Sequence, residues 1–133
     1  MYGWVSFFEG VSVDPLLIRA QGRKAENQAA WHLRLRGWRI AARNWYGGGG
    51  ELDLVASRWR TLLIVEVRRR VSGADALASI DRAKLDRTLR AANALVRAHD
   101  LQAYRLRFDV IGVDAHGHIH RRRNIMRDGI LGE

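Results

Sequence analysis

Three carboxylates interrupt two short apolar stretches near the middle of the chain, where they are the residues best placed to do chemistry. Glu51 and Asp53 alternate with leucines in GELDLVA, and Glu66 follows four apolar residues in LLIVEVR. Side chains alternate across a strand, so Glu51 and Asp53 share one face. If the two stretches form a hairpin that is symmetric about residues 59 and 60, Asp53 lies opposite Glu66. The same register sets Glu51 opposite Arg68.

Facing carboxylates need a positive charge between them, because like charges directly opposite each other destabilise a strand pair. A divalent cation such as Mg²⁺ or Mn²⁺ supplies that charge, with two carboxylates, waters and substrate phosphate oxygens as its ligands. Such an ion activates water and neutralises a phosphodiester transition state. The structural alternative is that Glu51 pairs with Arg68, while Asp53 and Glu66 are solvated on an open sheet face. The spacing alone leaves both interpretations open.

The charge of the chain favours a polyanionic partner. The 133 residues include 23 Lys and Arg against 14 Asp and Glu, which gives a formal net charge of +9. Nucleic acid is the partner expected from this balance. A solubilising surface, or a genome that favours arginine codons, is the alternative, since Lys24 and Lys84 are the only lysines.

Composition also limits the compartment and the number of domains. The chain has no cysteine, which excludes disulfides, a thiolate nucleophile and a cysteine-based zinc site, and fits a reducing cytoplasm. No stretch is apolar and long enough to suggest a membrane span. The length fits one domain, placed at residues 15–133. Residues 1–14 read as an extension that either packs on this domain or is disordered.

Apolar periodicity predicts the elements that position the acids. Helices are expected at 15–36 and at about 77–99, with Gly37 as the stop of the first. Strands are expected from Trp38 to Ala42, at 51–56, at 62–68 and at 104–110, with a short edge strand through Ile119. The glycine run at 47–50 suggests a mobile loop, and residues 57–61 a polar turn. The order predicts an α/β fold with a mixed β-sheet flanked by α-helices and a central hairpin that carries the acids.

Several strings in the same order resemble a known family. GRKAENQAAWHLRLRGWRIAARNW, GGGELDLVA and LLIVEVRRR, followed by Lys84 and the Arg107–Asp109 stretch, closely resemble the YraN-like uncharacterised protein family over roughly residues 22–125. The resemblance implies a restriction-endonuclease-like fold of the PD-(D/E)xK group, similar to archaeal Holliday junction resolvases. It also implies a metal-dependent endonuclease acting on DNA phosphodiesters, at branched or irregular structures by analogy with the resolvases.

Residue roles follow from that resemblance. Asp53 and Glu66 match the metal-binding acids, and Glu26 matches the acid of the first helix. Glu26 precedes Ala30 by one helical turn, on a face that should pack inward. Its alternative role is an ion pair with an arginine or a hydrogen bond to a loop amide. With Arg68, these three acids are the expected catalytic set.

The chain departs from the family pattern at Arg68, where the family has lysine. A guanidinium stays protonated and cannot act as a base, although it can orient a phosphate. Two outcomes follow: an endonuclease that retains activity, or a non-catalytic nucleic-acid-binding module with the same fold. Lys84 is a candidate to replace the missing lysine, but the sequence does not place its ammonium.

Other residues are candidates for contact with nucleic acid. Phosphate contacts are expected from Arg23, Arg58, Arg60, Arg69, Arg70 and Lys84, with Arg34, Arg36, Arg39, Arg43 and Arg121–Arg123 bordering the acids. Trp31 and Trp38 are expected in the core, and Trp45, Tyr46 and Trp59 are the candidates for base stacking. His116, His118 and His120 alternate, which fits either a metal site or a surface edge strand. Resolvase-like activity usually implies a homodimer that spans two strands.

Overall fold

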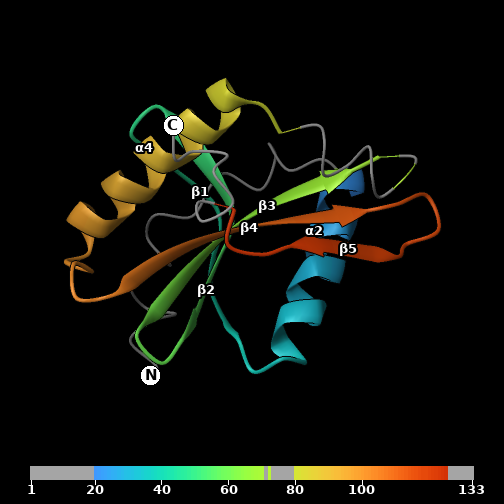
Figure 1. Ribbon diagram of the computed structural model, residues 1–133, viewed down its shortest axis with the longest axis horizontal. Coiled ribbons are helices and arrows are strands. Elements are labelled where there is room, and N and C mark those ends of the chain that lie inside the picture. The colour runs from blue at the N-terminus through green and yellow to red at the C-terminus, as the bar shows by residue number, and fades with distance from the viewer. Residues whose placement is uncertain (1–19, 71, 73–79, 126–133) are drawn as a thin grey trace.

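A computed structural model describes residues 20–70, 72 and 80–125, with side chains from residue 23 onward. Two helices and five strands follow one another along this part of the chain (Figure 1). They are α2 (Ala20–Arg34), β1 (Arg39–Gly47), β2 (Gly50–Arg58), β3 (Thr61–Arg69), α4 (Arg82–Ala98), β4 (Arg105–Val113) and β5 (Ile119–Arg122). The predicted extension at 1–14 lies outside the described residues.

The five strands form one mixed sheet in the order β1-β2-β3-β4-β5. β3 and β4 are parallel and are connected through α4, while the other neighbours are antiparallel. The predicted mixed α/β sheet with flanking helices is therefore confirmed. None of the helices in the described residues is long and apolar enough to cross a membrane.

The sheet is covered on both faces, which explains the unbroken apolar run at the centre of β3. One core packs Leu85 and Leu95 of α4 against Leu62 and Phe108 of the sheet. The other core packs α2 residues against Leu63 and its neighbours on the opposite face. In Figure 1, α4 and α2 accordingly lie on different sides of the strands. A strand buried on both faces reads as continuous hydrophobicity rather than alternation.

The C-terminus of α2 is set by Gly37, as the sequence predicted. Gly37 has φ +88°, its N–H donates to the Arg34 carbonyl, and the Trp38 N–H donates to the Leu33 carbonyl. This pair of bonds is the Schellman motif, in which a left-handed glycine satisfies the last carbonyls of a helix. The described helix ends at Arg34 rather than at residue 36, and the predicted residues 15–19 lie outside the described part.

α4 is shorter than predicted because a cap defines its start. The Asp81 side chain accepts a hydrogen bond of 2.8 Å from the Lys84 N–H, so the helix begins at Arg82 rather than near residue 77. Residues 77–79 lie outside the described part. An aspartate at this position satisfies an amide that the helix itself cannot. The cap also fixes the backbone of Lys84 in the first turn, where its side chain is turned toward β3.

The glycine run is not a mobile loop, and that prediction is wrong. β1 extends to Gly47 and β2 starts at Gly50, so that only Gly48 and Gly49 form the turn. Both have positive φ, +59° and +82°, as in the type I′ turns that suit two-residue hairpins. The strand predicted from Trp38 to Ala42 begins instead at Arg39 and continues to Gly47, so it is longer than predicted.

The same turn packs closely against α4. A Cβ on Gly48 would lie 2.6 Å from the Arg90 carbonyl oxygen, and one on Gly50 would lie 2.5 Å from the Arg87 carbonyl oxygen. Glycine is needed at these positions because the strand backbone approaches the helix backbone directly. The β1–β2 hairpin is thus held against the helix that carries Lys84.

The hairpin of β2 and β3 has the predicted register. Paired residues run from Arg58 and Thr61 at the turn to Leu54 and Val65, so the turn consists of Trp59 and Arg60 alone. The ladder of paired residues ends at Leu54 and Val65. Asp53 and Glu66 come next on the two strands, at the point where the strands separate.

Candidate functional site

Asp53 and Glu66 lie together where β2 and β3 separate. Asp53 Oδ2 accepts a hydrogen bond of 2.9 Å from the Val67 N–H, which continues the strand contact through a side chain. Glu66 is only 5% exposed, and the two carboxyl groups hydrogen-bond each other. Burial raises the pKa of Asp53 above its ordinary value. Burial and then the charge of Asp53 raise the pKa of Glu66 to about 8. The pair holds a proton more readily than two solvated carboxylates would.

Two cations approach the same oxygen of Glu66. Lys84 Nζ and Arg68 Nε each lie 3.5 Å from Glu66 Oε2. Both positive charges favour the ionised carboxylate, although burial outweighs them. Glu66 Oε1 and Arg68 Nε are buried without a hydrogen-bond partner. The structure therefore brings the ammonium of Lys84 to the same carboxylate oxygen that Arg68 contacts.

Glu51 belongs to a neighbouring contact. It lies opposite Tyr46 in the β1–β2 ladder, and the Tyr46 hydroxyl donates a hydrogen bond to its carboxylate. Burial and then the charge of Asp53 raise the pKa of Glu51. The Tyr46 pKa rises to about 12, through burial and then this hydrogen bond. The β2–β3 ladder ends before Glu51 and Arg68, so the predicted pairing of these two residues is not observed, and the ion pair of Arg68 is with Glu66.

Glu26 is buried on α2, as predicted, and interacts with β1. Asn44 Nδ2 donates to Glu26 Oε1 at 3.0 Å, and Arg43 Nη2 lies 3.9 Å from the same oxygen. Burial is the main cause of the raised pKa of Glu26, and the charge of Asp53 adds to it. Asn44 has φ +53°, a left-handed conformation that asparagine tolerates better than most residues. This strained residue connects the acid of α2 to the sheet.

Two hollows open beside the acids. The larger, of about 420 Å³, is lined by Tyr46, Glu51, Lys84, Arg87 and the glycines of the β1–β2 turn. The smaller, of about 200 Å³, is lined by Arg23, Glu26, Asn27, Arg43 and Asn44. Acids and cations thus border both openings, at the end of the sheet where β2 and β3 separate.

The donor set fits a divalent cation held by two carboxylates. Within the described residues, no three or more His, Asp or Glu side chains are grouped closely enough to hold a metal ion. Asp53 and Glu66 are the adjacent pair, and Glu66 Oε1 has no partner. Magnesium is commonly held by one or two carboxylates, with waters and substrate phosphates as the remaining ligands. Glu26 is near enough to influence Asp53 electrostatically rather than to join it.

The basic residues that were predicted to surround the acids are divided between two ends of the sheet. Lys84 and Arg68 lie at the acids, and Arg69 and Arg70 follow on the exposed end of β3. Arg58 lies five residues from Asp53 along β2, or about 17 Å, beside the turn that contains Arg60. The Arg58 guanidinium donates to the Arg36 carbonyl at 2.7 Å and lies 4.1 Å from the centre of the Trp38 ring. Arg58 therefore has a structural role in covering the end of α2.

Predictions for the aromatic residues are confirmed in part. Trp38 is buried in the core, whereas Trp31 is 60% exposed and not a core residue. Trp45 is only 4% exposed, so it cannot offer its ring to a base. Tyr46 and Trp59 remain stacking candidates, because they are 48% and 92% exposed. The glycines that follow Trp45 suggested an exposed loop, but the close approach of the β1–β2 hairpin to α4 buries the Trp45 ring.

The three histidines are not on one face of a strand. Only His120 lies in β5, while His116 and His118 belong to the preceding turn. Asp114 organises this turn, since its carboxylate accepts the N–H of both turn histidines at 2.9 Å and contacts His120 Nε2 at 2.9 Å. The alternation of histidines reflects a turn built around one aspartate.

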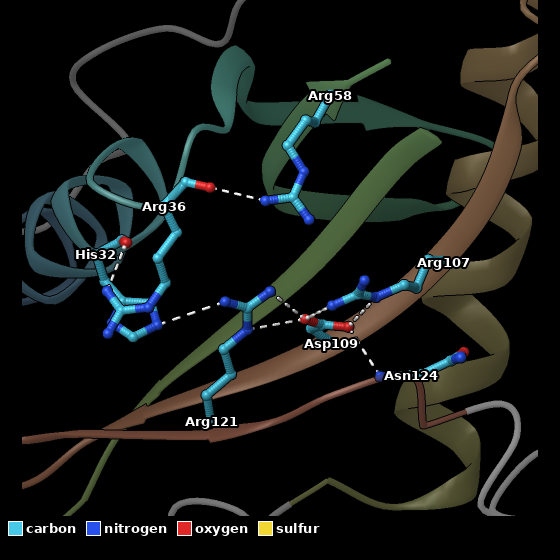
Figure 2. A network of polar contacts seen from close by, with 7 residues as sticks. All are labelled: His32, Arg36, Arg58, Arg107, Asp109, Arg121 and Asn124. Atoms are coloured by element: carbon cyan, nitrogen blue, oxygen red, sulfur yellow. Dashed lines mark hydrogen bonds and ion pairs between the residues drawn. The ribbon is translucent and has the colours of Figure 1, made fainter. Parts of the chain in front are cut away.

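The structure shows an ion-pair network around Asp109 that the sequence pattern did not predict. Asp109 is 1% exposed and accepts hydrogen bonds from the Arg107 and Arg121 guanidinium groups and from the Asn124 N–H (Figure 2). Burial raises its pKa, but these bonds outweigh burial and hold the pKa below its ordinary value. Arg121 Nη1 also lies 3.5 Å from His32 Nε2 on α2. The alternation of Arg107 and Asp109 in one strand was the signal available.

Comparison with known proteins identifies the family. The pattern of the uncharacterised protein family UPF0102 matches residues 25–113. A UPF0102 protein of Rhizorhabdus wittichii is 43% identical over 91 residues, which cover 68% of this chain and 77% of the relative. One from Pseudomonas entomophila is 43% identical over 100 residues, covering 73% and 81%. One from Myxococcus xanthus is 41% identical over 101 residues, covering 74% and 80%. With the YraN-like resemblance confirmed, the chain belongs to the uncharacterised protein family UPF0102.

Proposed function

We propose that this protein is a metal-dependent endonuclease with a restriction-endonuclease-like fold of the PD-(D/E)xK group, which cuts DNA phosphodiesters. The observation that carries the proposal is the Lys84 ammonium 3.5 Å from Glu66, beside the paired carboxyl of Asp53. Two acids and a lysine in one place are the set that the group uses. Here the lysine comes from α4 instead of from the strand position that Arg68 occupies.

Asp53 and Glu66 would hold the divalent cation, Mg²⁺ or Mn²⁺. When bound, the ion supplies Lewis acidity toward the phosphate and toward an attacking water. It also supplies a positive charge that would stabilise the ionised form of this buried pair of carboxyl groups.

The protein's own cations complete the site. Lys84 donates to a phosphate oxygen or to the attacking water and offsets the charge that develops during displacement. A guanidinium is not a base, so Arg68 would orient and neutralise phosphate. Glu26 assists through Asn44 and the β1 backbone. Arg23, Arg69 and Arg70 contact flanking phosphates, which gives affinity without base specificity.

Branched or irregular DNA is the expected substrate, with a homodimer spanning two strands and a reducing cytoplasm as the setting. The sequence resemblance to the YraN-like family, which implies a resolvase-like fold, supports the first two points, and the lack of cysteine supports the third.

The test is cleavage of labelled linear duplex, single-stranded and four-way-junction DNA with Mg²⁺ or Mn²⁺. Asp53→Asn and Glu66→Gln should each lower the rate at least about 100-fold, and Lys84→Ala about 10- to 100-fold. Lys24→Ala is the matched control, because Lys24 is the other lysine of the chain and is exposed on α2. It should retain the parent rate within about twofold. A parent-like rate for Glu66→Gln would overturn the assignment.

A second candidate function is a nucleic-acid-binding module that does not hydrolyse its ligand. Arg68 in the lysine position favours it. This module would bind DNA in a salt-sensitive manner without divalent metal, and no variant would show turnover. Arg68→Lys tests whether Lys84 has taken over the role of the missing strand lysine. If Lys84 already serves the site, this change should alter the cleavage rate by less than about threefold.

A further inference from the structure

The larger hollow is a cleft between the β1–β2 hairpin and α4, next to the proposed catalytic acids. Its volume is about 420 Å³, and it is lined by Tyr46, Glu51, Lys84, Arg87 and the glycines of the turn. Sites for small molecules commonly measure about 300–1,000 Å³. The cleft therefore has room for one unit of the size of a nucleotide.

The walls of the cleft are fixed by backbone contacts. The Gly48 and Gly50 positions lie directly against the carbonyls of Arg90 and Arg87, so no side chain could be added there without moving the hairpin or α4. The hairpin backbone therefore packs directly against the α4 backbone, and this contact sets the separation of the two walls. A cleft of this kind is formed before a ligand arrives.

The chemistry of the lining matches a nucleotide. The Tyr46 ring is 48% exposed, and its hydroxyl donates a hydrogen bond to the Glu51 carboxylate. Arg87 is exposed one helical turn after Lys84 on the same side of α4. An aromatic face beside cations is the combination that binds single-stranded nucleic acid, because the base stacks while the phosphate is neutralised. Glu51 adds an acceptor for an amino group of the base.

We propose that this cleft receives one unpaired nucleotide of the DNA strand next to the phosphate that is cut, with its base on Tyr46 and its phosphate at Arg87. The proposal rests on the proposed function for the position of the cut phosphate. A base within a duplex is covered on both faces by its neighbours, so it reaches the Tyr46 ring only when it is unpaired. The protein should therefore bind DNA preferentially at single strands, frayed ends and branch points.

The test is a binding measurement that does not depend on cleavage. Short oligonucleotides carrying 2-aminopurine are titrated with the full-length protein in EDTA, as single strands and as duplexes of the same length and salt concentration. The parent should bind the single strand at least about tenfold more tightly and quench the probe. Tyr46→Ala should raise the single-strand Kd at least about fivefold and remove the quenching, whereas Tyr46→Phe should retain both. Arg87→Gln should reduce the slope of log Kd against log salt by about 0.7.

Matched controls remove an exposed arginine and an exposed aromatic residue that do not line the cleft. Arg97→Gln removes an exposed arginine from the last turn of α4, and Trp31→Ala removes an exposed aromatic from α2. Both should leave the single-strand Kd within about twofold of the parent value. Equal affinity for single strand and duplex, or a Tyr46→Ala variant that binds and quenches like the parent, would overturn the cleft assignment.

The outcomes separate this proposal from the endonuclease. A protein that binds and quenches as expected but never cleaves would retain the cleft as a nucleotide site and remove the hydrolytic function. A protein that cleaves through Glu66, with a single-strand Kd that does not respond to Tyr46→Ala, would retain the endonuclease and remove the cleft assignment alone.

Discussion

Two buried carboxyl groups, Glu66 on β3 and Asp109 on the neighbouring strand β4, have surroundings that shift their pKa values in opposite directions. Asp109 pairs across the ladder with Val65, the residue before Glu66, so the two acids are adjacent in the sheet but on opposite faces. Asp109 is surrounded by donors and has a lowered pKa, with Arg121 2.8 Å away (Figure 2). Glu66 shares its site with another acid, has a pKa near 8, and leaves Oε1 without a partner.

The comparison separates an acid that holds the fold from one that is available for chemistry. A buried carboxylate with all its lone pairs used stabilises the native state and has nothing left for a ligand. A pair of buried carboxylates with an unused oxygen destabilises the protein until a cation binds. Perturbed pKa values in a cleft are typical of functional sites, and the direction of the shift distinguishes these two sites.

The largest expected effect comes from the Asp109 network. Asp109→Asn leaves the Arg107 and Arg121 guanidinium groups without their counter-charge, and we expect a loss of about 3–5 kcal/mol in unfolding free energy. Urea denaturation followed by circular dichroism measures it. Asp100→Asn, at an exposed position after α4, is the control and should change stability by less than about 0.5 kcal/mol. If Asp109→Asn lowered the unfolding free energy only slightly, Asp109 would not stabilise the fold, and its contrast with Glu66 would be contradicted.

Glu66→Gln should raise the unfolding free energy at pH 8, whereas Asp109→Asn should lower it. The folded-state pKa of Glu66 is raised, so the native state binds its proton more tightly than the unfolded chain does. Unfolding free energy therefore falls as pH rises from about 4.5 to about 8, the window between the ordinary value and the folded value. At pH 8 without metal, Glu66→Gln should be more stable than the parent by about 1–3 kcal/mol. Denaturation at pH 5 and pH 8 measures the difference, and a variant less stable than the parent at pH 8 contradicts it.

Divalent metal should reverse the instability of the carboxylate pair. Mg²⁺ or Mn²⁺ at ten times its Kd should add about 1.4 kcal/mol to the unfolding free energy of the parent. Thermal denaturation at pH 8, with the metal titrated, measures this gain. Asp53→Asn and Glu66→Gln should show no gain, whereas Asp109→Asn should keep it. Stabilisation that persists in Asp53→Asn would place the cation elsewhere.

The smallest effect is expected at the lysines. Lys84→Met removes a cation 3.5 Å from the largely buried Glu66 carboxylate, and we expect a loss of about 1 kcal/mol at pH 8 without metal. Lys24→Met should cost nothing measurable, since that side chain is exposed. Denaturation of the two variants in parallel gives the difference, and equal stabilities would show that Lys84 does not interact with Glu66 in solution.

Local pattern in the sequence determined the elements of the fold and the identity of the acids. Helical periodicity located both helices, Gly37 marked the end of α2, and alternation together with turn residues predicted the β2–β3 register that the ladder confirms. These features depend on neighbours within a few residues, which is the range over which backbone conformation and side-chain periodicity act. The prediction of a mobile loop at the glycine run was wrong because glycine is required there by contact with the α4 backbone, which is distant in the sequence.

The tertiary structure decided which charges meet. Lys84 reaches Glu66 because α4 crosses the sheet between two parallel strands, and no spacing in the sequence encodes that approach. The same holds for Glu26 with Asn44 and for Arg121 with Asp109, partners brought together by packing. Burial, too, is a property of the assembled layers, and it raises the pKa of Glu66 while full pairing lowers that of Asp109. The sequence supplied the ionisable groups, and the packed sheet and helices set their charge.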